Sequence, residues 1–281
     1  MRTKLVIVEG LPGSGKTTTA SALHKIVRNN NINSELYLEG NLDHPADYDG
    51  VASFSLSEWE QLLNTNQQWD ALVSYGQQKG DNILFPYRKI INQDSMFFSK
   101  EQLNDIYKHD IYELPFEQHA MLAAEKWAEF TEKALQDDKL YIFECCFIQN
   151  PLTIGMIKWG IPQEIVVEHV LSLEKIIRKL NPVLLYVDQD NLPKSFRKAY
   201  NDRPEEWRNE FIEYYTKQGY GKKHHHTGLN GTVEVLKRRK ELELEIYEQL
   251  TIKKYMLNNS LYDKSSARAQ ITDTLASFHL I

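Results

Sequence analysis

The stretch LVIVEGLPGSGKTT, residues 5–18, decides the fold of this chain. Its first four residues are apolar and mostly β-branched, which is typical of a parallel strand that is buried on both faces. Residues 10–17 then satisfy the pattern G-x-x-x-x-G-K-[ST], and apolar side chains recur at helical spacing over residues 17–29. A strand, a glycine-rich turn and a helix in this order predict a phosphate-binding loop.

Each position of this loop has a physical role in holding a phosphate. Gly10, Gly13 and Gly15 permit positive φ angles, so that backbone N–H groups can turn inward. The N-terminus of the following helix adds partial positive charge, and Lys16 can reach the β- and γ-phosphates. The Thr17 hydroxyl can join the coordination shell of Mg²⁺, so we expect ATP and Mg²⁺ as cofactors. The residues expected to bind ATP are Gly10, Pro12, Gly13, Ser14, Gly15, Lys16, Thr17 and Thr18.

Further apolar runs predict the other strands of a parallel sheet, at residues 36–38, 140–143, 182–187 and 255–257. They alternate with helical patterns, which is typical of an α/β fold. We predict a single domain, residues 1–281, with a three-layer α/β/α fold and a five-stranded parallel sheet. Residues 40–139 are predicted as a helical insertion after strand 2, rich in aromatic residues, and residues 189–232 as a lid-like region.

The amino-acid composition limits which classes of protein and which partners are plausible for this chain. The 281 residues are 42% hydrophobic and carry a net charge of −6, which is ordinary for a soluble globular protein and argues against nucleic acid as the main partner. The only cysteines, Cys145 and Cys146, are adjacent, which fits a reducing, cytoplasmic location. No apolar run is long enough to cross a membrane, so we expect no membrane partner, and a homodimer stays open.

Acidic residues stand at the predicted ends of several strands, where the ligands of parallel sheets collect. We predict Glu39 as the general base that accepts a proton from the acceptor, with Asp43 as its substitute if the strand end is misplaced. Glu144 is predicted to hold Mg²⁺ through water, together with Thr17, or else to support the substrate. Asp188 is interpreted as a cap of a helix or loop.

Arginines offer positive charge for the phosphates. Arg197 and Arg203 lie in the lid-like region, where such side chains clamp phosphates or cover the adenine. Arg88 follows an aromatic stretch of the insertion, and both a substrate pocket and a surface loop are consistent with it. Arg238 and Arg239 are expected on the exposed face of a helix.

Residues 8–18, VEGLPGSGKTT, are joined by acid-ended strands at Glu39, at Phe143-Glu144 and at Tyr186-Val-Asp188, the last followed by a helix with Arg197 and Arg203. These features resemble the nucleoside/nucleotide-kinase-like branch of phosphate-loop proteins. The loop, with Glu39 and His44-Pro45 after the second strand, is also similar to a group of uncharacterised bacterial proteins with an E-G-L-P-G-S-G-K-[ST]-T start. The resemblance implies a parallel sheet in kinase strand order, ATP as donor and a lid over the phosphates. The arginine that such kinases carry after strand three is absent, which argues against an ordinary nucleoside or nucleotide acceptor.

These patterns predict an ATP-dependent phosphotransferase that acts on a hydroxyl of a small molecule. Residues 40–139 would form the acceptor pocket, and their aromatic content suggests a flat or partly apolar acceptor. The alternative is a regulatory or assembly NTPase that hydrolyses nucleotide slowly and has no acceptor. A kinase should carry a concave pocket facing the γ-phosphate, whereas a switch protein should expose a face that reorders with nucleotide. The His224–His226 run is interpreted as a polar loop and not as a metal site.

Overall fold

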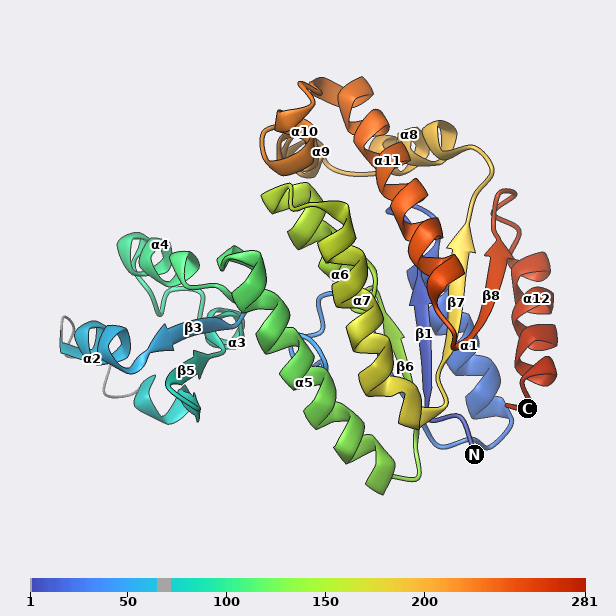
Figure 1. The fold of residues 1–281 in the computed structure, drawn as a ribbon, viewed down its shortest axis with the longest axis horizontal. Coiled ribbons are helices and arrows are strands. Elements are labelled where there is room, and N and C mark those ends of the chain that lie inside the picture. Colours follow the sequence, from blue (N-terminus) through green and yellow to red (C-terminus); the bar gives the residue numbers. More distant parts are fainter. Residues whose placement is uncertain (1, 65–71) are drawn as a thin grey trace. The chain divides into compact units, whose positions relative to one another are not determined.

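The computed structural model describes residues 2–64 and 72–281, and the chain divides into two compact units (Figure 1). The larger unit comprises Met1–Glu39 and Ala124–Ile281, and the smaller unit comprises Gly40–Ala123. The smaller unit therefore begins three residues after the second strand ends and closes within a long helix, α5 (Phe116–Gln136).

A five-stranded, all-parallel sheet forms the centre of the larger unit. In spatial order the strands are β2 (Ser34–Tyr37), β6 (Leu140–Glu144), β1 (Leu5–Glu9), β7 (Val183–Asp188) and β8 (Lys253–Asn258). The apolar runs predicted as strands are thus confirmed. The register pairs Val8 with Glu144 on one side of β1 and Glu9 with Tyr186 on the other. The glycine-rich loop therefore leaves the sheet where its two neighbouring strands end.

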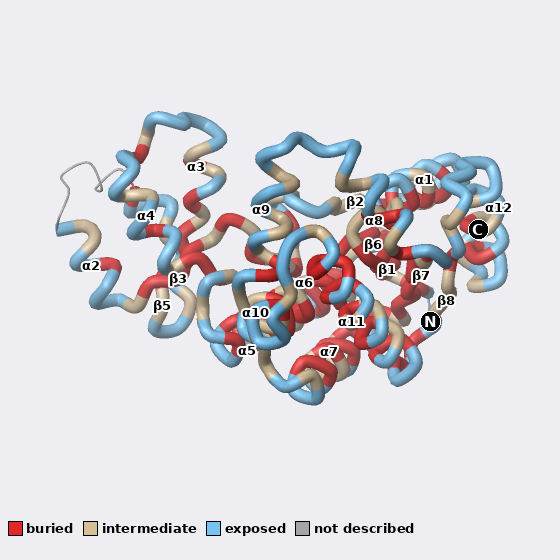
Figure 2. Tube along the Cα trace, turned by 90° about the horizontal axis from the view of Figure 1, so that it is seen from above, coloured by how far each residue is buried: buried red, intermediate tan, exposed pale blue. Residues whose placement is uncertain are grey.

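Apolar side chains on alternate positions of the strands pack against helices on both faces of the sheet. Val6 and Val8 face α1 (Lys16–Asn29) and α12 (Lys264–Ser277), with which they share one buried cluster. On the other face, Trp127 and Phe130 of α5 pack on Phe143, with ring centroids 5.8 and 4.7 Å apart. β1, β6 and β7 are buried along nearly their whole length (Figure 2). This arrangement is compatible with three layers, helix, sheet and helix.

The remaining helices of the larger unit follow β6 and β7 along the chain. They are α6 (Gln149–Leu152), the π-helix η3 (Thr153–Trp159), α7 (Gln163–Ile177), the 3-10 helix η4 (Arg178–Leu180), α8 (Leu192–Asn201), α9 (Glu205–Thr216), α10 (Gly219–Lys223) and α11 (Gly228–Gln249). Residues 192–208 are charged and helix-like in sequence throughout, but the structure divides them between α8 and α9. Pro204 separates α8 from α9, because a proline disfavours helical geometry in the residue before it.

The smaller unit contains an antiparallel sheet that the sequence did not predict. Its order is β3 (Ala52–Ser55), β5 (Asn82–Phe85) and β4 (Gln77–Lys79). Such short strands do not establish an alternating pattern of apolar and polar residues, and for this reason the sequence indicates only helix and loop over residues 40–139. The helices here are α2 (Leu56–Asn64), α3 (Tyr87–Gln93), α4 (Lys100–Lys108) and the 3-10 helix η2 (Ile111–Glu113). Phe54, Trp59 and Phe85 meet in its buried core.

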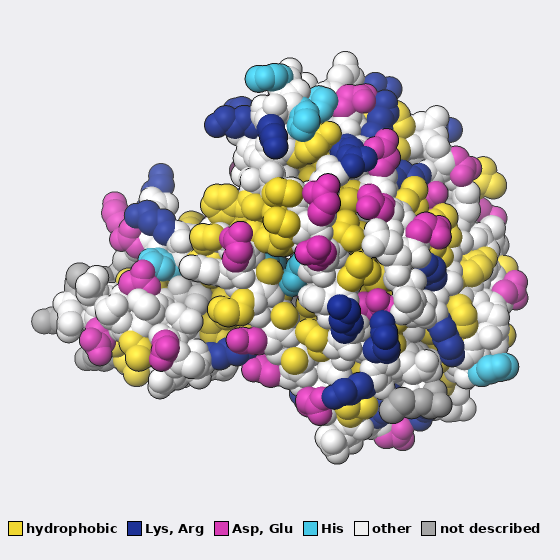
Figure 3. Space-filling model, in the orientation of Figure 1, with side chains coloured by type: hydrophobic (Ala, Val, Ile, Leu, Met, Phe, Trp, Pro, Cys, Tyr) yellow, Lys and Arg dark blue, Asp and Glu magenta, His cyan; other side chains and the backbone are white. Residues whose placement is uncertain are grey.

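Charged side chains of both signs are interspersed on the face of the molecule shown in Figure 3. The net charge of −6 is therefore not gathered into one field on that face. Within residues 2–64 and 72–281, no helix combines the length and the apolar character needed to cross a bilayer.

Glu174 of α7 holds the connection between α11 and β8, which leads to a first prediction. The carboxylate is 3% exposed and accepts hydrogen bonds from the backbone N–H groups of Thr251 and Ile252. Replacing Glu174 by Ala leaves these donors without their acceptor. We expect the free energy of unfolding, measured by urea titration, to fall by about 1.5–3 kcal/mol.

Glu132→Ala is the matched control for this prediction. Glu132 forms an exposed ion pair with Lys179 at 3.1 Å, and its removal should change the same free energy by less than about 1 kcal/mol. Equal losses in the two variants would contradict the role assigned to Glu174.

Candidate functional site

The loop between β1 and α1 has the backbone geometry that close approach of a ligand requires. Gly10 and Gly15 have φ angles of 142° and 98°, and Gly15 is the N-cap of α1. A Cβ atom at Gly10 would lie 2.4 Å from the carbonyl oxygen of Val187. Only glycine therefore fits at Gly10, and the loop can turn its N–H groups inward at the helix N-terminus.

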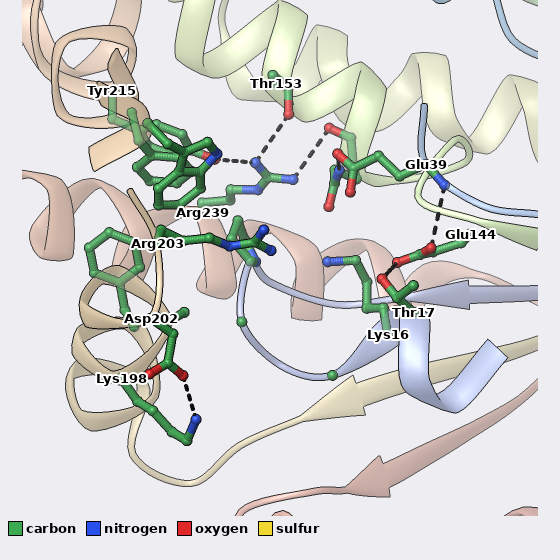
Figure 4. A pocket seen from close by; sticks show the side chains of 18 of the residues that line it. Lys16, Thr17, Glu39, Glu144, Thr153, Lys198, Asp202, Arg203, Tyr215 and Arg239 are labelled. Carbon is green, nitrogen blue, oxygen red and sulfur yellow. Dashed lines mark hydrogen bonds and ion pairs between the residues drawn. The ribbon is translucent and has the colours of Figure 1, made fainter. Parts of the chain in front are cut away.

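Lys16 and Thr17 begin α1 and meet the end of β6 (Figure 4). The Lys16 ammonium is buried and donates a hydrogen bond to the carbonyl oxygen of Leu11 at 3.1 Å. The Thr17 hydroxyl donates to Oε1 of Glu144 at 2.6 Å. The start of α1 thus holds a buried cation and, beside it, a hydroxyl that is bonded to the last residue of β6.

Glu39 lies beside Glu144, as expected for residues that follow neighbouring parallel strands. Its backbone N–H donates to Oε2 of Glu144 at 3.3 Å. Gln149 Nε2 donates to Oε1 of Glu39 at 2.8 Å, and Cys145 Sγ donates to Oε2 at 3.4 Å. Burial lowers the pKa of Lys16, but the negative charges of the glutamates near it outweigh this effect, so the pKa of Lys16 is above its ordinary value.

Two overlapping groups of side chains could hold a cation at this place. Thr17 and Glu144 offer the hard oxygen donors that Mg²⁺ prefers. The ligand atoms of Glu39, Glu144 and Cys145 also lie within 4.8 Å of one another. Cys145 has a φ angle of 74°, a conformation that non-glycine residues rarely adopt and that clusters at functional sites. Burial raises the pKa of its thiol well above the ordinary value.

Glu9, the last residue of β1, fixes the turn that carries these side chains. It is 1% exposed, and its carboxylate accepts hydrogen bonds from the backbone N–H groups of Phe147, Ile148 and Gln149 at 2.8, 2.8 and 3.1 Å. Burial raises the pKa of Glu9 to about 7, although these hydrogen bonds oppose the shift. The sequence showed Glu9 only as part of the loop pattern and gave it no role.

A cavity of about 900 Å³ lies beside the loop, and every residue that lines it belongs to the larger unit. Lys16, Thr17, Glu39 and Glu144 line one part of it, together with Pro12, Gly13, Gly15 and Thr18 of the loop. Aromatic side chains of α8 and α9 line another part: Phe196, Trp207, Phe211, Tyr214 and Tyr215. The rings of Phe211 and Tyr215 stack, with centroids 4.3 Å apart. Polar groups on one side and stacked rings on the other suit a flat, charged ligand.

The two arginines of the predicted lid differ in their surroundings. Arg203 lines the cavity, and its guanidinium lies 5.4 Å from the ring centre of Trp207. Arg197 is exposed and donates to Oδ1 of Asn230 at 3.4 Å, and it is absent from the described residues that line the cavity. The structure therefore brings Arg203, and not Arg197, to the same cavity as Lys16.

Arg239 is the residue whose position the sequence missed. It was expected on an exposed helix face, but it is 1% exposed and lines the cavity. Its Nε donates to Glu243 at 2.7 Å, and its Nη1 donates to the hydroxyls of Thr153 and Tyr215 at 3.1 and 2.8 Å (Figure 4). Arg238, by contrast, is partly exposed and pairs with Glu241, as expected.

The spacing along α11 could have revealed this burial. Leu236, Arg239, Glu243 and Ile246 follow one another at intervals of three or four, and all of them are buried. An arginine and a glutamate four residues apart within an apolar stripe form an internal ion pair. Such a pair is also common on the surface of a helix, and the expectation of an exposed Arg239 follows from that more common case.

The other residues predicted for the site have local partners. Asp43 pairs with Lys89, and Arg88 pairs with Asp49, all within the smaller unit. Their role at a substrate pocket, and that of residues 40–139, stays a prediction. Asp188 forms an ion pair with Lys240 of α11 at 2.6 Å, in keeping with a structural role.

The raised pKa of Glu9 predicts a pH dependence of stability. The unfolded chain loses the Glu9 proton near the ordinary value of 4.5, whereas the folded chain keeps it up to about 7. The stabilisation is therefore complete below pH 4.5 and is lost as the pH rises through 7. From pH 5 to 8 we expect the free energy of unfolding of the wild type to fall relative to Glu9→Gln, by up to about 3 kcal/mol. Parallel pH profiles in urea titrations of the two proteins would contradict this.

Comparison with protein-family models gave no match, and comparison with curated protein sequences gave none either. The case for a function therefore rests on the geometry of the site.

Proposed function

We propose that this chain is an ATP-dependent phosphotransferase that moves the γ-phosphoryl group to a hydroxyl of a small molecule. In this proposal the fold is a phosphate-loop kinase-like fold in which residues 40–139 are inserted after strand 2. The supporting observation is the convergence of Lys16, Thr17, Glu39 and Glu144 beside one cavity, at the carboxyl end of a parallel sheet. Ligands of open parallel sheets bind at that end.

Each converging residue has a role in the transfer. Glu39 takes the proton of the acceptor hydroxyl, whose oxygen then attacks the γ-phosphorus as the bond to ADP breaks. Gln149 and Cys145 hydrogen-bond both carboxylate oxygens of Glu39 and so hold it in place. Lys16 and Arg203 offset the negative charge that develops on the moving phosphoryl group.

The oxygen donors present suit Mg²⁺. Thr17 and Glu144 would hold the ion, because hydroxyl and carboxylate oxygens already in contact are the ligands it prefers. When bound, the ion supplies positive charge next to the phosphates.

The cavity favours a transferase over a regulatory NTPase without an acceptor. Its volume of about 900 Å³ is at the upper end of small-molecule sites, and the lining includes stacked rings as well as the loop. A cavity of this size has room for an acceptor beside the phosphates, which a protein that only hydrolyses ATP does not need. The aromatic wall is a candidate surface for a flat acceptor or for the adenine.

The proposal predicts that Glu39→Gln abolishes transfer and leaves ATP binding intact. A pooled panel of nucleosides, nucleotides, sugars and antibiotics is incubated with Mg-ATP, and an added phosphoryl mass is sought by mass spectrometry. With the acceptor found, Glu39→Gln should lower the rate by about 10²–10⁴-fold, because the base is lost. Lys16→Ala serves as the inactive control.

Glu35→Gln is the matched control. Glu35 is an acidic residue of β2 that pairs with Lys139 and does not line the cavity, so this variant should keep the wild-type rate. Full transfer in Glu39→Gln would show the base assignment to be wrong. Loss in Asp43→Asn instead would assign the base to Asp43.

The two lid arginines give a prediction that needs no acceptor. Arg203→Ala should weaken Mg-ATP binding by about tenfold or more, because a charge-assisted hydrogen bond to phosphate contributes roughly 1.5–3 kcal/mol. Arg197→Ala, on the exposed face of α8, should stay within about twofold of the wild type. Titration calorimetry with a non-hydrolysable ATP analogue measures the affinity of each variant. A larger loss of affinity in Arg197→Ala than in Arg203→Ala would exclude Arg203 as the phosphate ligand.

A further inference from the structure

Glu39, Glu144 and Cys145 bring two carboxylates and a thiol to one point. Their ligand atoms lie within 4.8 Å of one another, and neither Cys145 nor Cys146 is in a disulfide. Glu144 and Cys145 are buried, whereas Glu39 is exposed. The group is therefore anchored in the protein and open on one side.

The spacing of the sulfur and the oxygen suits one metal ion. A tetrahedral Zn²⁺ ion with Zn–S near 2.3 Å and Zn–O near 2.1 Å holds such ligands about 3.5 Å apart. The observed distance from Cys145 Sγ to Glu39 Oε2 is 3.4 Å. A thiolate combined with carboxylates favours Zn²⁺ and Co²⁺ over Mg²⁺, because sulfur is a soft ligand.

Gln149 gives a second, independent indication of a ligand at this point. It is 7% exposed and lines the cavity. Its Nε2 faces Glu39, whose carboxylate only accepts hydrogen bonds, so the orientation of the amide is fixed. Within residues 2–64 and 72–281, its Oε1 has no hydrogen-bond partner. This buried carbonyl oxygen is an open acceptor, which a water on a metal ion would satisfy.

The charges around the group favour a cation. Lys16 is the nearby positive charge, and its ammonium is engaged with the carbonyl oxygen of Leu11. It faces the two glutamates and the thiol, which gives up its proton to solvent when a metal binds. The divalent ion and the ammonium of Lys16 together then balance the three negative ligands.

We propose that Glu39, Glu144 and Cys145 form a site for a thiophilic divalent cation of the Zn²⁺ class. The three side chains are the protein ligands, and the fourth position opens to the cavity. Gln149 Oε1 accepts a hydrogen bond from the water bound there. Metal binding does not depend on the phosphotransferase proposal, although Glu39 and Glu144 serve in both.

Co²⁺ is the probe, because a thiolate–Co²⁺ bond gives a charge-transfer band in the near ultraviolet. The reduced, metal-free and nucleotide-free full chain is titrated with Co²⁺. We expect the band in the wild type and in Cys146→Ser, and its loss in Cys145→Ser. Addition of Zn²⁺ should remove it, because Zn²⁺ binds such ligands more tightly than Co²⁺. Histidine–Co²⁺ bonds do not give this band, so the His224–His226 run does not interfere.

Folding of each variant is checked by circular dichroism. Should Cys145→Ser fail to fold, Glu39→Gln decides the question, with the band kept and the affinity for Co²⁺ at least about tenfold lower. The proposal is overturned if the wild type gives no band, if Cys145→Ser keeps it, or if Glu39→Gln binds Co²⁺ as the wild type does.

Discussion

The carboxylate of Glu9 ties the central strand of the sheet to the turn that follows its neighbour. It accepts three backbone N–H groups, of residues 147–149, in a place from which water is excluded. Without it these donors would be buried and unpaired, which costs far more than the net gain of a hydrogen bond. Because Glu9 also precedes Gly10, one side chain sets both the start of the glycine-rich loop and the position of Gln149. Gln149 in turn holds Glu39, so the candidate base is placed by the core of the sheet.

The ion pair of Arg239 and Glu243 on α11 likewise connects the sheet to a neighbouring element. Glu243 also accepts a hydrogen bond from the Tyr186 hydroxyl of β7 at 2.7 Å, and Arg239 reaches Tyr215 of α9. A buried pair of this kind is expensive to form, but breaking it leaves an unpaired charge in the interior. It therefore links the sheet to the aromatic wall of the cavity through groups that cannot easily exchange partners. The wall keeps its orientation toward the loop for this reason.

Much of the larger unit was predictable because its signals are local. A run such as residues 5–8 is apolar at every position only when both faces of a strand are covered, and glycines at fixed spacing identify the loop. The meeting of Glu39 with Glu144 also followed, since parallel strands end at one edge. Arg239 and the rings of α9 were missed because their burial depends on packing between distant segments. The division into α8 and α9 at Pro204 was not predicted, because the charged pattern continues on both sides of the proline. The antiparallel sheet was not predicted because its strands have only three or four residues, too few to establish an alternating pattern.

Glu144 belongs to two groups of side chains that suit different cations, one with Thr17 and the other with Glu39 and Cys145. Its Oε1 accepts from Thr17, on the side of the phosphate loop, and its Oε2 accepts from the backbone N–H of Glu39, on the side of Cys145. In the two proposals, a hard cation held with Thr17 and a thiophilic cation held with Cys145 both use this carboxylate, and their positive charges would repel at such a distance. Binding on one side would therefore lower affinity on the other, and by linkage the effect would be reciprocal. A cysteine at position 145 would then make the site sensitive to which divalent ions are present, because its sulfur is a ligand that selects among them.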